Sequence, residues 1–237
     1  MKPMLAKNLK GQDVSGWFMS EKFDGVRALW DGKVLRSRNG RKFNPPKWWT
    51  ADLPDVPLDG ELWIAHGEFQ LIASTVRKRY ESKHWPKVKY VVFDAPEFPA
   101  SYKSRLEFLV GLHLGGVVLV PSQHVCEDVA HARNFCEGVC SVGGEGIILR
   151  HPEALYQEGR SDAMLKLKPF DTDEAKVVGH DGRAILCRWN RQEFKIGSGV
   201  PHDDLPYIGS RITFKYMGLT NHGIPRHAAL VAERDYE

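Results

Sequence analysis

The chain has 237 residues, of which 42% are hydrophobic, and its formal net charge at pH 7 is +3. A chain of this length and hydrophobic content can bury one large core or two modest ones, and no apolar run approaches the length that spans a membrane. The charge is too small to indicate a nucleic-acid partner by itself. Local motifs therefore carry the argument about function.

The first segment with chemical meaning is residues 20–27, SEKFDGVR. It combines Lys22, an Asp-Gly turn and a second cation, Arg27, within one strand-to-turn segment. A lysine attacks phosphorus only as the neutral amine, which desolvation or neighbouring cations favour. We predict Lys22 as the nucleophile, Arg27 as a phosphate ligand and Gly25 as a turn residue with positive φ. The alternative is a solvated lysine in a chance hairpin turn.

Three more segments follow in chain order, at residues 37–40 (SRNG), 58–63 (LDGELW) and 90–96 (YVVFDAP). The Asp31–Gly32 turn predicts a hairpin that places Lys22 and Arg38 on neighbouring antiparallel strands. Glu61 leads into an apolar strand, and Phe93 ends a run too hydrophobic for a surface strand. The alternatives are a strand-end charge for Glu61 and an ordinary core position for Phe93.

Residues 145–150 (EGIILR) and 165–169 (LKLKP) complete the set. Period-2 alternation predicts that Lys166 and Lys168 share one face of a strand. Taken singly, Glu145 could be a strand-end charge, and the two lysines could form a solvated sheet edge that blocks aggregation.

Together and in this order, the six segments resemble the motif set of the covalent nucleotidyltransferases, which comprise DNA ligases, RNA ligases and RNA capping enzymes. The resemblance covers essentially the whole chain and is closest to ATP-dependent DNA ligases of the minimal bacterial type without appended domains. It implies that Lys22 attacks the α-phosphorus of ATP, forms a lysyl-AMP phosphoramidate and releases pyrophosphate.

The resemblance also implies a role for each of the other motif residues, and each residue type suits its role. Arg27 and Arg38 would hold phosphate and the nick, Glu61 the ribose hydroxyls, Phe93 the adenine, Glu145 a Mg²⁺ ion (or Mn²⁺ in its place), and Lys166 and Lys168 the α-phosphate.

A basic stretch at residues 77–89 interleaves cations with Tyr80, His84 and Trp85. Cations with aromatic side chains suit the backbone of a nucleic-acid duplex, although a solvated helix end is the alternative. We expect a monomer that binds nicked double-stranded DNA. The residues predicted to contact DNA are Arg38, Lys42, Arg77, Lys78 and Lys83.

Pro169 and the acidic cluster after it predict a hinge between an adenylation domain, residues 1–169, and a second domain, residues 170–237. The first mixes strands with helices at 69–83 and 127–139, and we expect an α+β domain built on antiparallel sheet. The second has five short strand-like runs, typical of a small barrel, which the resemblance makes an OB-fold. These runs are 175–178, 184–189, 193–196, 211–217 and 228–232, and a buried strand is expected within 114–121.

Three features depart from the family pattern or bear on location. Arg226 and Arg234 fit only loosely the family's last motif, an arginine-rich strand that orients pyrophosphate. The four cysteines lack the spacing of a zinc site and indicate free thiols in a reducing compartment. The start of the chain lacks the apolar core of a signal peptide, so we expect a cytoplasmic protein, or a periplasmic one if an export signal was removed.

The alternatives to a DNA ligase are an RNA ligase, a GTP-dependent capping guanylyltransferase with the same lysine chemistry, and a non-catalytic nick-binding module. NAD⁺ dependence is disfavoured, because family members that use NAD⁺ carry an extra N-terminal domain and a four-cysteine zinc module.

Overall fold

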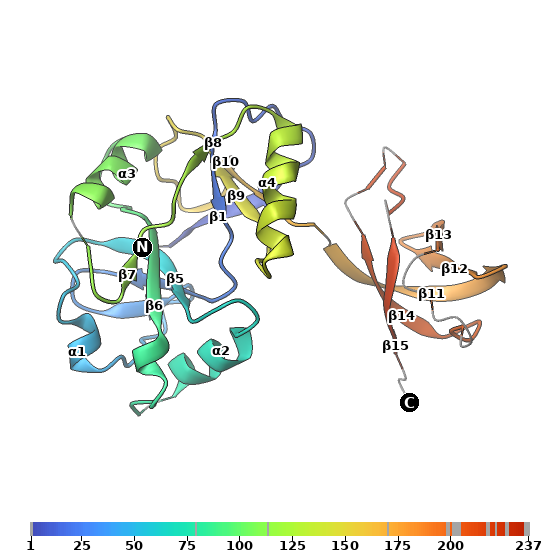
Figure 1. Cartoon of the computed structure of the whole chain (residues 1–237), viewed down its shortest axis with the longest axis horizontal. Helices are drawn as coiled ribbons and strands as arrows, with labels where there is room; N and C mark the ends of the chain where they lie inside the picture. The colour runs from blue at the N-terminus through green and yellow to red at the C-terminus, as the bar shows by residue number, and fades with distance from the viewer. Residues whose placement is uncertain are drawn as a thin grey trace. The chain divides into compact units, whose positions relative to one another are not determined.

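The computed structural model describes residues 2–78, 80–112, 114–169, 171–197, 200, 205–216, 219–220, 222–225 and 228–234. The chain divides into two compact units, Met1–Leu167 and Lys168–Glu237, coloured blue to gold and orange to red in Figure 1. The first unit ends with the last residue of strand β10 (Gly159–Leu167), whereas the expected hinge was at Pro169.

The first unit contains two five-stranded sheets. The β9 sheet has the order β1-β10-β9-β2-β8 and the β5 sheet the order β4-β3-β5-β6-β7. Neighbouring strands are antiparallel except β1 with β10 and β6 with β7. The strands are β1 (Met4–Asn8), β2 (Phe18–Glu21), β3 (Val26–Trp30), β4 (Leu35–Ser37), β5 (Leu58–Trp63), β6 (Lys89–Asp94), β7 (Val118–Leu119), β8 (His124–Val125) and β9 (Ile147–Arg150).

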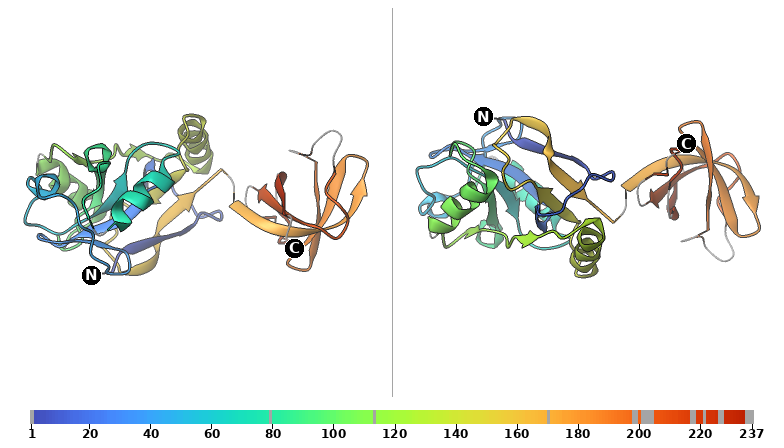
Figure 2. Two further views of the ribbon diagram at one scale, coloured as in Figure 1. Left: turned by 90° about the horizontal axis from the view of Figure 1, so that it is seen from below. Right: turned by 90° about the horizontal axis from the view of Figure 1, so that it is seen from above.

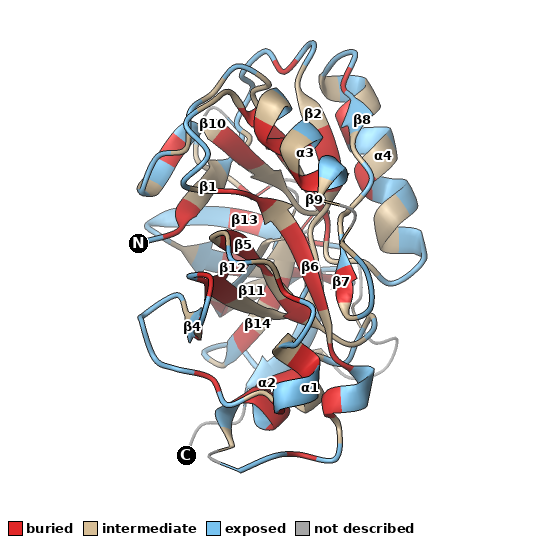
Figure 3. Ribbon diagram, turned by 90° about the vertical axis from the view of Figure 1, so that its left-hand side faces the viewer, coloured by how far each residue is buried: buried red, intermediate tan, exposed pale blue. Residues whose placement is uncertain are grey.

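Each sheet has its own hydrophobic core. Leu62, Trp49 and Tyr90 belong to the cluster of the β5 sheet, and Met19 and Leu149 to that of the β9 sheet. Figure 3 shows the central strands of both sheets largely buried. The helices of the described residues are α1 (Lys47–Thr50), α2 (Phe69–Arg77), α3 (Tyr102–Gly111) and α4 (Val129–Ser141), with a 3₁₀ turn at Trp85–Lys87.

Local chemistry sets the ends of two helices and one strand, and in all three cases the bounds differ from those expected. Helix α2 ends at Arg77 because Lys78 takes an extended backbone, so the helix does not reach residue 83. Helix α4 starts at Val129 and not at residue 127, because the side chain of Asp128 accepts a hydrogen bond from the His131 amide and so caps the helix at its N-terminus. The strand expected within 114–121 shrinks to Val118–Leu119, because glycines precede it in a turn.

The second unit is one five-stranded antiparallel sheet of order β13-β12-β11-β14-β15. Figure 2 shows it strongly curved, as expected for a small barrel. Val177, Ile185, Ile212 and Phe214 are fully buried in its core. Across the described residues, no helix is long and apolar enough to cross a membrane. The strands are β11 (Asp171–Asp181), β12 (Ala184–Trp189), β13 (Gln192–Ile196), β14 (Arg211–Tyr216) and β15 (Ala229–Arg234).

Candidate active site

A pocket in the first unit is lined by side chains from both of its sheets and from α3. Residues of β2 and β9 form one wall, and residues of β3, β5 and β6 form the other. The lining residues are Ser20, Glu21, Lys22, Phe23, Arg27, Glu61, Phe93, Tyr102, Ile148, Arg150 and Met164.

Lys22 lies in the connection between β2 and β3, where the chain passes from one sheet to the other. Its amide donates a 2.8 Å hydrogen bond to the Gly146 carbonyl, and its Nζ forms an ion pair with Glu145. The lysine side chain is 25% exposed, so it remains accessible from the pocket. The nitrogen must leave the ion pair and lose a proton before it can attack an electrophile.

Close packing, and not a positive φ, requires glycine at position 25. Our expectation of a positive φ was wrong. A Cβ at this position would lie 2.2 Å from the Leu62 carbonyl oxygen and 2.9 Å from Cγ of Glu61. Its φ lies outside the left-handed region. The missing side chain lets the connection lie directly against β5, which brings Lys22 next to Glu61.

Arg27 is held by a buried carboxylate. Its Nε and Nη2 each donate a 2.6 Å hydrogen bond to Asp59, which is 0% exposed. The Tyr156 hydroxyl donates a further 2.7 Å bond to the same carboxylate. Burial opposes the charge of Arg27, but Asp59 outweighs it and raises the arginine pKa. Nε and Nη2 of the guanidinium are thus bonded to Asp59, so we expect Nη1 to be the nitrogen that contacts a phosphate.

Glu61 lies opposite Arg27 in the β3–β5 pairing and lines the pocket. Burial raises the pKa of its carboxyl group to about 7, while the positive charges of Arg27 and Lys22 act in the opposite direction. The carboxyl group therefore exchanges a proton near neutral pH.

Phe93 lines the pocket beside two guanidinium groups, whose Cζ atoms lie 4.6 Å (Arg27) and 5.3 Å (Arg150) from its ring centroid. The next residue, Asp94, is fully buried and pairs with both Arg105 and Arg150. Sequence reasoning missed the roles of Asp59, Asp94 and Arg150. The available signal was a carboxylate within or ending an apolar strand, because a buried charge needs a partner.

On the β9 sheet, Ser20, Ile148 and Lys166 are register partners and so share one face. Ser20 and Ile148 line the pocket, which places Lys166 on the pocket face of β10. Lys168 is different, because β10 ends at Leu167 and Lys168 is the first residue of the second unit. The expectation that both lysines share a strand face was wrong for Lys168.

Arg38 is exposed in the turn after β4, whereas Lys22 lies between β2 and β3. The prediction that the two occupy neighbouring strands was therefore wrong, although the hairpin of β3 and β4 forms. Lys42 is exposed and lies outside the pocket.

Three further residues predicted to bind DNA, Arg77, Lys78 and Lys83, do not line the pocket. Arg77 and Lys83 are exposed, and Nζ of Lys78 lies 5.8 Å from the Tyr80 ring centroid. Arg226 is outside the described residues. Arg234 ends β15 of the second unit. Within the described part of the chain, no group of three or more His, Cys, Asp or Glu residues is arranged to hold a metal ion.

Comparison with known families decides between the remaining alternatives. A model of the ATP dependent DNA ligase domain matches residues 3–168, and a model of the DNA ligase OB-like domain matches residues 176–234. The chain belongs to the ATP-dependent DNA ligase family. The predicted fold class, an α+β nucleotidyltransferase domain followed by an OB-fold, and the predicted enzyme class are thereby confirmed for this ligase.

Individual relatives agree with the family models. The ligase is 37% identical to the DNA ligase of Haemophilus influenzae, over 98% of this chain and 91% of the relative. A solved structure from structure–function work on Lig E DNA ligases, concerned with DNA binding by a minimal scaffold, is 37% identical, covers 99% of both chains and has a TM-score of 0.71. The ligase domain of LigD from M. tuberculosis shares the fold, with a TM-score of 0.74 at 21% identity over 98% of this chain and 94% of that chain.

Proposed function

We propose that the ligase seals nicks between 5′-phosphate and 3′-hydroxyl ends of duplex DNA through AMP bound covalently to Lys22. The observation that carries the proposal is the position of Lys22 in a pocket lined by both sheets, beside Glu61, Phe93 and its ion-pair partner Glu145. This places one potential nucleophile among groups suited to a base, a ribose and phosphates.

In the first step, the neutral amine of Lys22 attacks the α-phosphorus of ATP. A nitrogen–phosphorus bond forms, the bond to the bridging oxygen breaks, and pyrophosphate leaves with the electron pair. The 5′-phosphate of the nick then takes AMP from the lysine, and the 3′-hydroxyl displaces AMP to close the strand. Each step needs positioning and charge stabilisation more than covalent help from the protein.

Residues in and around the pocket would divide this work. Phe93 offers a flat apolar face to adenine, and Glu61 accepts hydrogen bonds from the ribose hydroxyls when it is ionised. Lys166, on the pocket face of β10, and Lys168 stabilise negative charge on the α-phosphate. Arg27 and Arg38 bind phosphate groups of ATP or of the nick.

The carboxylate of Glu145 suits Mg²⁺, or Mn²⁺ in its place, because a hard cation takes one or two carboxylate oxygens together with phosphate oxygens and water. When bound, such a cation would neutralise charge on the phosphate oxygens. Glu145 also forms an ion pair with Lys22.

DNA binding by a monomer would use cations outside the pocket, among them the exposed Arg38, Lys42, Arg77 and Lys83 and the half-buried Lys78. These side chains neutralise backbone phosphates, so the affinity for nicked DNA should fall steeply as salt rises.

The test is incubation with ATP or GTP labelled at the α-phosphate, followed by denaturing electrophoresis and, separately, by addition of a nicked duplex. We expect a labelled protein band with ATP, transfer of the label to the DNA 5′ end, and a sealed strand. A band that forms only with GTP, or a nicked duplex that stays unsealed by the labelled protein, would contradict the proposal.

A further inference from the structure

The two residues that flank Lys22 are both held by one segment, which consists of the end of β5 and the connection after it. On one side, the Glu21 carboxylate pairs with Nε2 of His66 at 2.7 Å. On the other side, the Phe23 ring packs edge-on against Trp63, with ring centroids 5.3 Å apart. Trp63 in turn packs against the His66 ring at 5.6 Å. The nucleophile of the proposed reaction therefore lies between two neighbours that the same segment holds.

His66 also contacts the connection between α4 and β9. Its Nδ1 lies 2.9 Å from the Val142 carbonyl oxygen, which can only accept a hydrogen bond, so Nδ1 donates it. The backbone of Gly143 lies against the same histidine. Its φ is +93°, and a Cβ there would lie 3.3 Å from Cβ of His66. The imidazole ring is thus fixed in orientation, with Nε2 toward Glu21.

His66 in this way joins the two sheets of the first unit beside the nucleophile. It belongs to the connection after β5, whereas Glu21 ends β2 and Val142 precedes β9, and both of these strands belong to the other sheet. The side chains are only partly exposed, to 32% for His66 and 23% for Glu21, so water and salt screen their bond less than that of a surface pair. A hydrogen bond to a carboxylate is also roughly twice as strong as one between neutral groups.

This arrangement bears on the first chemical step more than on nucleotide binding. His66 does not line the pocket, whereas Glu21 and Lys22 do. Attack requires the amine nitrogen to approach within about 3–3.5 Å of phosphorus, in line with the leaving group. Because Glu21 and Lys22 are adjacent in the chain, a small displacement of Glu21 moves the lysine with it.

We propose that His66 is a positioning residue for Lys22. Its bond to Glu21 and its packing against Trp63 hold both neighbours of the lysine, so that the nitrogen can approach the α-phosphorus of ATP. The inference rests on the proposed function, because it concerns the transfer of AMP to Lys22. The alternative is a purely structural histidine, whose loss would weaken the fold and slow every step of the reaction alike.

Three substitutions of His66 separate its two hydrogen bonds. His66→Ala removes both, His66→Asn keeps a donor near Nδ1 for Val142 but loses the bond to Glu21, and His66→Gln keeps a donor near Nε2 for Glu21. The measurement is the single-turnover rate of label transfer from α-labelled ATP to the full chain without DNA, with circular dichroism to check folding. Alanine and asparagine should lower the rate about tenfold or more, whereas glutamine should stay within about threefold of wild type.

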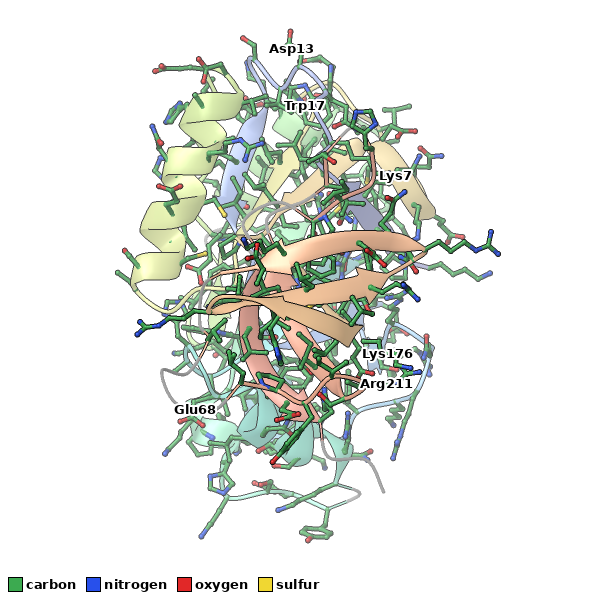
Figure 4. The ribbon with its side chains drawn as sticks, turned by 90° about the vertical axis from the view of Figure 1, so that its right-hand side faces the viewer. Lys7, Asp13, Trp17, Glu68, Lys176 and Arg211 are labelled. Atoms are coloured by element: carbon green, nitrogen blue, oxygen red, sulfur yellow. The ribbon has the colours of Figure 1, made fainter. Side chains whose placement is uncertain are left out.

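A second histidine of the same unit provides the matched control. His151 is also half-buried, packs edge-on against Trp17 at 5.3 Å, and accepts a 3.2 Å hydrogen bond from the Glu153 amide through Nδ1. It does not line the pocket. Figure 4 shows Trp17 well separated from Glu68, which follows His66 by two residues. His151→Ala should therefore leave the rate of label transfer unchanged.

Two further measurements distinguish positioning from a general structural role. The KM for ATP should change by less than about twofold in His66→Asn, because the lost interaction acts on the nucleophile and not on the bound nucleotide. Sealing of a nick that already carries AMP on its 5′-phosphate should also stay within about twofold of wild type, because Lys22 is not the nucleophile of that step.

Glu21→Ala tests the same bond from its other end. It should slow label transfer, and combining it with His66→Asn should cause no further loss, because each substitution already removes the one shared interaction. Losses that multiply in the double variant would overturn the inference, because the two side chains would then act independently.

Label transfer at the wild-type rate in His66→Asn would also overturn it. So would equal losses in His66→Asn and His151→Ala, or equal losses in label transfer and in sealing of the adenylated nick. If the wild type itself takes no label from ATP, the proposed function fails instead.

Discussion

Glu145 forms an ion pair with Lys22 beside the pocket, although the two residues are 123 positions apart in the sequence. The contact is possible because β2 and β9 are paired antiparallel, so the residue after β2 lies beside the residues before β9. The nucleophile of the proposed reaction is therefore positioned by the pairing of two strands that are far apart in the sequence.

The first prediction concerns this lysine. Lys22→Ala should abolish transfer of label from α-labelled ATP, and Lys22→Arg should fail as well, because the guanidinium stays protonated. Gel autoradiography measures the transfer, and circular dichroism checks that both variants fold. Labelling at the wild-type level in either folded variant would show that Lys22 is not the nucleophile.

The second prediction concerns Lys166 and Lys168, the two lysines that follow Leu165. Lys166→Ala should lower the single-turnover rate of adenylation by roughly 10²-fold or more, as loss of a preorganised charge contact does. We expect a comparable loss for Lys168→Ala. An unchanged rate in both variants would mean that these lysines only solvate the end of β10.

The third prediction concerns the Arg27–Asp59 pair, which is buried and doubly hydrogen-bonded. Asp59→Asn leaves the arginine charge buried without its counter-ion and should lower the free energy of unfolding by about 3–5 kcal/mol. The matched control is Asp162→Asn, in the Lys7–Asp162 pair whose carboxylate is 82% exposed. That change should cost less than about 1 kcal/mol in urea titrations. Equal losses in the two variants would contradict the argument.

The fourth prediction concerns pH. Burial raises the pKa of Glu61 to about 7, above the value of about 4.3 in an unfolded chain. A raised carboxyl pKa contributes stability that is fully present below the unfolded pKa and is lost as pH rises through the folded pKa. Glu61→Gln should therefore gain about 2–3 kcal/mol relative to wild type between pH 5 and pH 8. Parallel stability curves over this range would show that the carboxyl group titrates normally.

The fifth prediction concerns the basic stretch after α2. Changing Arg77, Lys78 and Lys83 together to alanine should weaken binding to a nicked duplex and flatten its salt dependence, since each phosphate contact contributes about −0.9 to the slope. Adenylation without DNA should stay at the wild-type rate, because none of these residues lines the pocket. An unchanged slope would contradict the prediction and would indicate that the first unit contacts DNA through Arg38 and Lys42 instead.

The sequence by itself was sufficient for the family, the fold class and most of the strands. Apolar alternation and turn residues are local signals, and they predicted the hairpin after Trp30, the strand of Phe93 and the strand runs of the second unit. Local signals failed at element ends. Helix α2 ends at Arg77, before the extended backbone of Lys78, and strand β10 ends at Leu167.

Contacts between distant segments were decided only by the tertiary structure. The sequence contains Asp59 and Asp94, but nothing local indicates that they pair with Arg27 and Arg150, because such pairs depend on which strands become neighbours. The same holds for Gly25, whose backbone is pressed against Leu62. Burial, and with it the raised pKa of Glu61, arises only once two sheets enclose the pocket. Sequence order cannot encode this directly, because desolvation depends on every segment that excludes water from the carboxyl group.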